Sequence, residues 1–468
     1  MKHLQKYVAI LDSMGGVPDA QIITKIWLAA REDLEERKRF FDWYDGTADP
    51  INETPKDPDI IDNRIDIAFP ARIINTKVGY LFGNPLRVRL NGDSYSDEEK
   101  DLLKIVRSEN DMSDLDQETG RYSSASGYCG RLFDLAPEDG RPRSQAERFR
   151  ATLIEPWLCA FITTGEIYNP EYAFRVWDEE RGTDVIKVMR FYSKTSAYTF
   201  ELPAGQGVWA AVGEPEPVIF GGVPLVGYPA NRQLRPDFWY GREKIKAYEK
   251  RVSSFDSELE GERHGYTVFQ DVEVNETERR KAQKIGGIAI KSSGQHEAKV
   301  YRIEKQLHPD AHIAHLQQLT QDINQDCSHV DWTDEKFGGN LSGVAIKYKI
   351  LPLENKCITH QQKHEAADRQ MYWLLFNWYM TLTGRSIDYR DVSIEWTRNL
   401  PPNISEEVGM VAQAKGVVSD ETAYGLGKSF IPDPAAEKEA FDNENPVVQL
   451  TGNVEGQEED EGSEGEAE

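Results

Sequence analysis

The sequence has few cysteines, and their spacing excludes two kinds of fold. Cys129, Cys159, Cys327 and Cys357 are the four cysteines among 468 residues, and no two of them form a Cys-x-x-Cys pair. A zinc ribbon or a disulfide-stapled scaffold requires closer and more regular spacing. We therefore expect free thiols in a reducing compartment, with no bound metal and no other cofactor.

Long hydrophobic runs are also missing. The most apolar stretch, residues 371–380 (MYWLLFNWYM), has half of the roughly 20 residues that a membrane-spanning helix needs. The first residues, MKHLQKYVAILDSMGG, contain too short and too interrupted an apolar run for a signal peptide. These features predict a soluble intracellular protein with no membrane partner.

Basic residues are in short supply. The chain has 55 Lys and Arg against 80 Asp and Glu, a net charge of -25 at pH 7 and a pI near 4.9. A protein that coats nucleic acid needs a basic excess to displace the phosphate counterions, so that class is disfavoured. Nucleic acid could still pass close to the protein without being held.

Nucleotide-binding loops occur only as fragments. Residues 205–210 (GQGVWA) match a dinucleotide-loop pattern, but they lie between β-like runs and open no helix. Gly427-Lys428-Ser429 resembles the end of a phosphate-binding loop, yet Thr422 stands where its first glycine belongs. Neither fragment predicts an ATPase or a dehydrogenase.

Two groups of histidines leave an enzymatic alternative open. Their helical spacing could supply zinc ligands for an acidic metallohydrolase, although Gln361 stands where a general-base glutamate is needed. The candidate ligands are His308, His312 and His315 in one group, and His360 and His364 in the other.

The first half of the chain predicts an α+β body. Residues 21–44, 62–82 and most of 97–135 have helical periodicity, whereas residues 86–90 alternate as a strand does. Residues 152–226 consist of short alternating runs separated by turn residues, which is typical of an antiparallel β region.

Two helical rods follow, at residues 237–263 and about 309–330. Apolar residues recur at spacings of three and four on each rod, and Asp237 is a candidate N-cap for the first. We expect these stripes to pack the rods together or against neighbouring subunits through Ile245, Val252, Phe255, Leu259, Leu316 and Ile323. Residues 265–303 read as strands around a short helix at the far end of this hairpin.

The last third begins with a glycine-rich loop, residues 331–343 (DWTDEKFGGNLSG). A helix of nearly 40 residues is predicted from 344 to 382, with a kink at Pro352. A strand-like segment at 387–396 and helices within 404–444 follow. Residues 455–468 contain eight acidic and no basic residues, so they are expected to be solvated.

Four segments, in this order, resemble the portal proteins of tailed bacteriophages and prophages of the siphophage type. They are Phe41-Asp42-Trp43-Tyr44-Asp45-Gly46 with Ile51, Asp62-Asn63-Arg64-Ile65 through Gly79-Tyr80-Leu81-Phe82-Gly83-Asn84-Pro85, Phe337-Gly338-Gly339 through Lys347 with Leu353-Glu354, and Asn399-Leu400-Pro401 through Lys415-Gly416-Val417-Val418-Ser419-Asp420-Glu421-Thr422-Ala423. Together they span about residues 35–440.

The resemblance implies a non-enzymatic ring, usually of twelve subunits, at one capsid vertex of the virion. DNA would pass through it during genome packaging, head-to-tail joining and ejection, and assembly would take place in the host cytoplasm. Implied partners are other copies of the chain, double-stranded DNA bound without sequence specificity, the terminase large subunit, a head-completion or adaptor protein, and the major capsid and scaffold proteins.

The resemblance also assigns parts of the chain to the portal fold. It implies a wing (1–236), two stem helices (237–264 and 305–330) around a clip (265–304), a tunnel loop (331–343), a kinked helix with a wing strand (344–398), a crown (399–445) and an acidic tail (446–468). Within the tunnel loop, Lys336, Phe337, Gly338, Gly339 and Asn340 are the residues expected to face DNA.

Overall fold

The computed structural model describes residues 4–53, 55–56, 61–136, 144–263, 266–270, 299–303, 309–331, 343–400, 404–427, 431 and 433–444. The chain divides into two compact units, one of Met1–Leu341 with Ala345–Asn399 and one of Ser342–Val344 with Leu400–Glu468. Helices and antiparallel sheets both contribute to the larger unit, so the predicted α+β class is confirmed.

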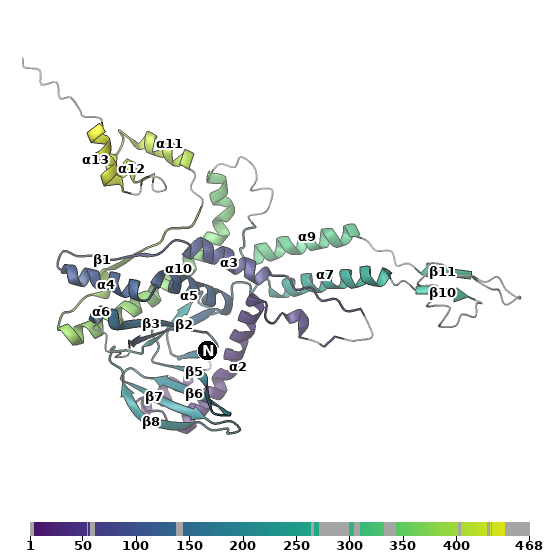
Figure 1. Cartoon of the computed structure of the whole chain (residues 1–468), viewed down its shortest axis with the longest axis horizontal. Helices are drawn as coiled ribbons and strands as arrows, with labels where there is room; N and C mark the ends of the chain where they lie inside the picture. The colour runs from purple at the N-terminus through teal and green to yellow at the C-terminus, as the bar shows by residue number, and fades with distance from the viewer. Residues whose placement is uncertain are drawn as a thin grey trace, which may run out of the picture. The chain divides into compact units, whose positions relative to one another are not determined.

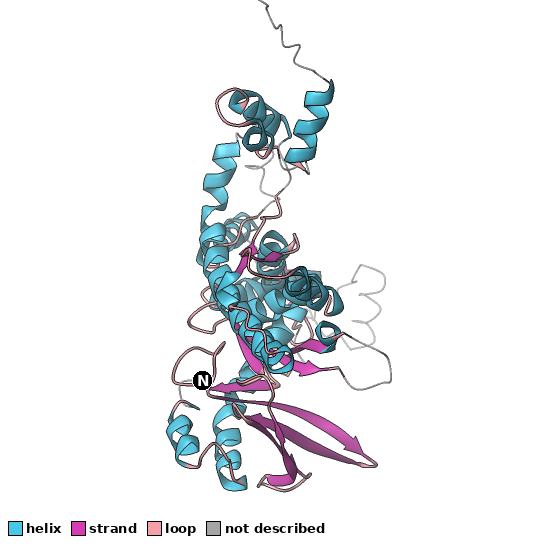
Figure 2. Ribbon diagram, turned by 90° about the vertical axis from the view of Figure 1, so that its left-hand side faces the viewer, coloured by secondary structure: helices cyan, strands magenta, loops and turns pink. Residues whose placement is uncertain are grey.

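Two N-terminal helices, α1 (Lys6–Ser13) and α2 (Ala20–Asp45), cover a five-stranded sheet. Asp19 caps α2 by accepting a hydrogen bond from the Ile22 N–H, and Gly46 ends the helix in the left-handed conformation. Ile23, Ile26 and Leu34 of α2 pack on the sheet with Phe174 and Phe191. Figure 2 shows helices beside the strands of this sheet. The predicted helix at 21–44 is confirmed.

The β region predicted at 152–226 forms two antiparallel sheets. The five-stranded sheet has the order β4-β5-β6-β7-β8, and the other has the order β3-β2-β9. The strands are β2 (Tyr128–Leu135), β3 (Phe149–Ile154), β4 (Cys159–Ile162), β5 (Tyr172–Arg181), β6 (Asp184–Tyr192), β7 (Ser196–Leu202), β8 (Ala210–Pro217) and β9 (Leu225–Pro229), and a short helix α6 (Gln145–Arg148) precedes β3.

The helical prediction for 97–135 is wrong at its end. Helices α4 (Asp97–Glu109) and α5 (Met112–Ser126) occupy most of it, but residues 128–135 form β2, the central strand of the three-stranded sheet. Gly127 between them has a φ of 94°, and a side chain there would collide with the Leu234 backbone. A continuous helix cannot pass through that conformation.

The helix predicted at 62–82 begins later than expected. Helix α3 spans Phe69–Phe82, whereas residues 61–68 have no regular structure. The backbone N–H groups of Asn63 and Ile65 instead donate to the Ser257 and Ser253 hydroxyls. A 3₁₀ turn, η2 (Pro50–Asn52), lies in the preceding loop.

The core of the larger unit forms around helix α10 (Gly343–Thr383). Met371, Leu374, Leu375 and Trp378 are buried against α4, β2, β3 and β9, so the apolar run at 371–380 is a core helix segment. Pro352 lies within α10, and Figure 1 shows the helix changing direction after its first turns. No helix among the described residues is long and apolar enough to cross a membrane.

A two-stranded sheet closes the far side of this core. Strand β12 (Val392–Glu395) pairs antiparallel with β1 (Arg87–Leu90), and the 3₁₀ turn η4 (Tyr389–Asp391) leads into it. The sequence predicts strand-like segments at 86–90 and 387–396, but it does not predict that they pair. Their pairing joins residues about 300 positions apart in the sequence.

The two rods are helices α7 (Arg242–Arg263) and α9 (Pro309–Asp326), which lie side by side (Figure 1). Strands β10 (Tyr266–Gln270) and β11 (Lys299–Ile303) pair antiparallel beyond them. In the smaller unit the described helices are α11 (Ile404–Ala414), α12 (Asp420–Tyr424) and α13 (Pro434–Glu444).

Candidate functional site

The expected DNA-facing loop lies outside the described residues. This applies to Lys336, Phe337, Gly338, Gly339 and Asn340, and also to His308 and the acidic run 455–468. The candidate site is therefore built from the hairpin, from the segments that hold it on the body, and from the buried charges beneath it.

The apolar stripes of the hairpin are buried at its base and exposed toward its tip. Ile245 of α7 and Ile323 of α9 are fully buried, whereas Leu259, farther along α7, is 44% exposed. Phe255 packs on the His312 ring with centroids 4.4 Å apart, and Val252 and Leu316 are half-buried. Lys244 on α7 forms an ion pair of 2.9 Å with Asp326 on α9.

Asp237 is not the N-cap of the first rod, because α7 begins at Arg242. Its carboxylate is buried and lies 2.8 Å from the Lys77 ammonium and 3.7 Å from that of Lys356. Burial opposes its charged form, but the two lysines outweigh burial and hold the pKa of Asp237 below its usual value. Lys356 also donates to the Cys327 carbonyl. Asp237 therefore links α3 to α10 through the two lysines, and Lys356 extends this link to the end of α9.

The Asp62-Asn63-Arg64-Ile65 segment attaches to the outer side of α7. The Asn63 amide donates to the Asp256 carboxylate at 2.8 Å and to that of Glu260 at 2.7 Å. Together with the two backbone hydrogen bonds to Ser253 and Ser257, these contacts hold the segment against α7. The segment is thus hydrogen-bonded to helix α7 of the hairpin.

Three of the sequence segments that suggested a common family contact one another. Asn399 donates its backbone N–H to the Tyr80 carbonyl and its side-chain amide to the Gly79 carbonyl. The Tyr80 hydroxyl donates to Glu354 at 2.6 Å, and Arg398 makes a bidentate contact with the same carboxylate. Burial opposes ionisation of Glu354, yet Arg398 and Tyr80 keep its pKa below the usual value.

This contact explains why glycine stands at position 83. A Cβ on Gly83 would collide with the Gly79 carbonyl oxygen and with the Asn399 side-chain amide, whereas one on Gly79 would meet nothing within 4 Å. Gly83 has ordinary right-handed backbone angles, so the requirement is for space and not for an unusual conformation. The close approach lets residues 397–399 lie against the end of α3.

We expect opposite results from alanine at these two glycines. Gly83→Ala should lower the free energy of unfolding by about 1–3 kcal/mol because it forces Asn399 away from α3. Gly79→Ala, inside the same helix, should leave stability unchanged or raise it by about 0.5–1 kcal/mol. Chemical denaturation of both variants tests this, and equal stabilities would contradict the packing described.

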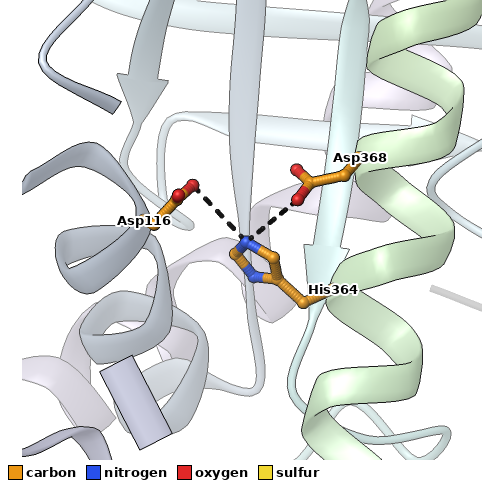
Figure 3. A group of neighbouring side chains, drawn as sticks. All are labelled: Asp116, His364 and Asp368. Atoms are coloured by element: carbon orange, nitrogen blue, oxygen red, sulfur yellow. Dashed lines mark ion pairs between the residues drawn. The ribbon is translucent and has the colours of Figure 1, made fainter. Parts of the chain in front are cut away.

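A second group of charges lies at the centre of the larger unit (Figure 3). Asp116 of α5 and Asp368 of α10 are fully buried on either side of His364, whose Nε2 lies 3.6 and 3.7 Å from their oxygens. Arg131 of β2 donates to Asp116 at 2.8 Å and lies 3.5 Å from Asp368. Arg107 lies 3.2 Å from Asp116.

These arginines determine the charge state of the group. Burial penalises an ionised Asp116, but Arg131 in particular outweighs burial and lowers its pKa. Burial raises the pKa of Asp368. Arg131 further donates to the Thr119 hydroxyl at 2.8 Å and stacks 4.3 Å from the Tyr228 ring centre. Two carboxylates are thus balanced by two guanidinium groups.

The histidine groups do not assemble into a hydrolytic site among the described residues. His312 packs on Phe255, His315 is exposed, and His360 lies 3.1 Å from the Ser123 hydroxyl. His364 does lie between two aspartates in a geometry that could hold a metal. A divalent cation there would add charge beside two guanidinium groups, which disfavours it. The arrangement fits a structural ion network.

Sequence reasoning missed this network because its members are far apart in the chain. The available signals were Arg131 within an apolar strand and the i, i+4 spacing of His364 and Asp368. Neither signal identifies Asp116 as the shared partner. Only the packing of α5, β2 and α10 brings them together.

Comparison with known proteins places these observations in a family. The family model described as "Phage portal protein, SPP1 Gp6-like" matches residues 23–446. The portal protein of Bacillus phage SPP1 is 22% identical over 461 residues, an alignment that covers 90% of this chain and 83% of that protein.

Proposed function

Because the chain belongs to the SPP1 Gp6-like family of phage portal proteins, we propose that its copies form a ring that conducts double-stranded DNA at one vertex of the capsid. A portal protein is a structural component of the virion, and its family implies a homo-oligomeric ring. The observation that carries the proposal is the family match over nearly the whole described chain.

Each part of the chain receives a role in this proposal. The body up to residue 236 is the wing, α7 and α9 are the stem, and β10 with β11 belongs to the clip. Residues 331–343 form the tunnel loop, α10 with β12 connects stem to wing, and α11 to α13 form the crown. The hairpin of two long helices ending in paired strands supports this assignment.

The charge of the protein supports a conduit more than a DNA-binding protein. A net charge of -25 gives little electrostatic attraction for phosphates, so DNA can slide without being held. We propose that a separate terminase ATPase drives the movement by docking on the clip, and that an adaptor protein, the major capsid protein and a scaffold contact other faces. Ring assembly would take place in the host cytoplasm. We propose a ring of twelve subunits.

The tunnel loop provides the test of the conduit role. Lys336 is the one basic residue within 331–343, and it is followed by Phe337, Gly338 and Gly339. Lys336→Glu should leave rings intact and reduce genome packaging or retention, because it replaces the only positive charge that each loop offers to phosphates. Gly338→Val with Gly339→Val should reduce packaging further by stiffening the loop.

Electron microscopy first shows whether each purified variant forms rings. It then gives the fractions of DNA-filled and empty heads assembled with each variant. The parent protein should show a ring with a central hole of about the width of duplex DNA. If heads fill normally with both variants, the loop does not contact DNA in a way that affects packaging. A parent protein that forms no rings would refute the proposed function itself.

A further inference from the structure

The segment that joins β9 to α7 carries two arginines whose charge is not balanced within the described part of the chain. Arg232 is exposed and Arg235 is half-buried. Among the described residues, neither guanidinium forms an ion pair with a carboxylate. Neither arginine belongs to the buried ion networks described above, and neither lies in the loop to which the proposed function assigns DNA.

Aromatic side chains accompany these arginines. The Arg235 guanidinium lies 4.7 Å from the centre of the Trp239 ring, and that of Arg242, the first residue of α7, lies 3.8 Å from the same centre. The next residue, Tyr240, is 67% exposed. Arginine, tryptophan and tyrosine are the residue types that are enriched in protein–protein interfaces. The name arginine patch is used below for Arg232, Arg235, Trp239 and Tyr240.

The loop that presents the arginine patch is held in one conformation. Leu234 has a φ of 56°, in the left-handed region that residues other than glycine rarely adopt. The buried Arg37 guanidinium donates to the Leu234 carbonyl and, at 2.8 Å, to that of Ser126. The Asn231 side chain bonds to the backbone N–H and C=O of Arg235 at 3.2 and 2.7 Å. Because the loop is already ordered, it loses little conformational entropy when a partner binds.

The carboxylates near the arginine patch already have basic partners. Asp237 is buried beside the two lysines described above. Asp326, at the end of α9, lies 2.9 Å from the Lys244 ammonium, and Glu243 lies 3.2 Å from the Arg242 guanidinium. The arginine patch therefore keeps a local excess of positive charge in a chain whose net charge is -25.

We propose that the arginine patch binds an acidic surface of a second copy of this chain. The inference rests on the proposed ring, in which copies that each carry a net charge of -25 lie side by side. Such copies repel one another unless positive groups of one meet carboxylates of the next. In a ring the two halves of this contact lie on different faces of each copy.

A neighbouring copy fits the arginine patch better than DNA does. Proteins that hold DNA neutralise several phosphates with clustered basic residues, and two unpaired arginines in an acidic chain provide little of that charge. Every neighbouring copy, in contrast, brings an excess of carboxylates. An effect on DNA without an effect on assembly is therefore an outcome that would contradict the proposal.

The first test is charge reversal in the full chain. Arg232→Glu with Arg235→Glu should lower the fraction of chains in rings by about tenfold or more, because carboxylates would then face carboxylates. The control is Arg87→Glu with Arg89→Glu, which reverses two exposed arginines on β1 and should assemble like the parent. Size-exclusion chromatography and negative-stain microscopy measure assembly, and circular dichroism checks that each variant is folded.

The second test identifies the acidic half of the contact. Arg232→Lys with Arg235→Lys keeps both positive charges, so this variant should form rings. A carbodiimide, which joins an amine to a carboxylate in contact with it, should then link the introduced amines to a carboxylate of another copy. Rings mixed from ¹⁵N-labelled and unlabelled chains allow mass spectrometry to separate links between copies from links within one copy.

The outcomes separate this inference from the proposed function. A parent protein that forms no rings would overturn both. If the parent forms rings, equal assembly of the charge-reversal variant, or carbodiimide links only within one copy, would overturn the inference alone. An equal loss of rings in the β1 control would overturn it as well, since the effect would then be one of net charge. Normal rings of the charge-reversal variant in heads that retain less DNA would assign the arginine patch to DNA instead.

Discussion

Arg131→Met should lower the free energy of unfolding by about 3–5 kcal/mol. The guanidinium of Arg131 is fully buried, and its loss leaves Asp116 and Asp368 with Arg107, His364 and the Tyr228 hydroxyl as their polar neighbours. The cost arises mainly from the two carboxylates that remain in the core, because the methionine side chain fills much of the vacated volume. Denaturant unfolding monitored by circular dichroism measures it.

The pH dependence of this variant identifies the cause of the loss. Without Arg131 the pKa values of Asp116 and Asp368 should rise, so protonation at pH 5 should relieve part of the penalty that is present at pH 8. The matched control is Arg181→Met, since Arg181 is 45% exposed and its pairs with Glu179 and Glu201 lie at the surface. That change should leave the free energy of unfolding nearly unchanged. Equal losses in both variants would contradict a central role for the buried network.

Val252→Asp combined with Phe255→Asp should abolish ring formation while the body keeps its helices and sheets. Phe255 packs on His312 of the other rod, and Val252 lies one turn before it on α7, half-buried. Two carboxylates there would lie in a partly dehydrated seam between α7 and α9, and the cost of burying their charge should separate the two helices. In the proposed ring every subunit contributes this hairpin to the stem, so the defect is repeated around the ring.

Size-exclusion chromatography and negative-stain microscopy measure the loss of rings. Ala247→Asp with Ser254→Asp adds the same charge to α7 at two exposed positions and is the control. Rings that survive the Val252 and Phe255 changes would disprove the packing role of the stripe. If only the control variant, Ala247→Asp with Ser254→Asp, loses its rings, the subunit contact lies on the other face of α7.

Local patterns in the sequence determined the type and approximate position of most elements. The spacing of three and four residues between Ile245, Tyr248, Val252 and Phe255 and the alternation within 152–226 require no knowledge of distant residues, because each reflects the period of one helix or strand. The same holds for the apolar run at 371–380, whose length excluded a membrane span. Four short segments in a fixed order were enough to indicate the portal family, which the family match confirms.

The tertiary structure alone decided what the polar residues do. Asp237 has the composition and position of an N-cap, yet it neutralises Lys77, a residue 160 positions away. Residues 62–68 carry a helical pattern, but they have no regular structure, and the backbone N–H groups of Asn63 and Ile65 donate to the Ser257 and Ser253 hydroxyls of α7. Arg131 and His364 acquire their roles from burial and from partners on other elements. A periodic pattern is a property of neighbouring residues, whereas the free energy of a buried charge depends on which distant charges the fold places beside it.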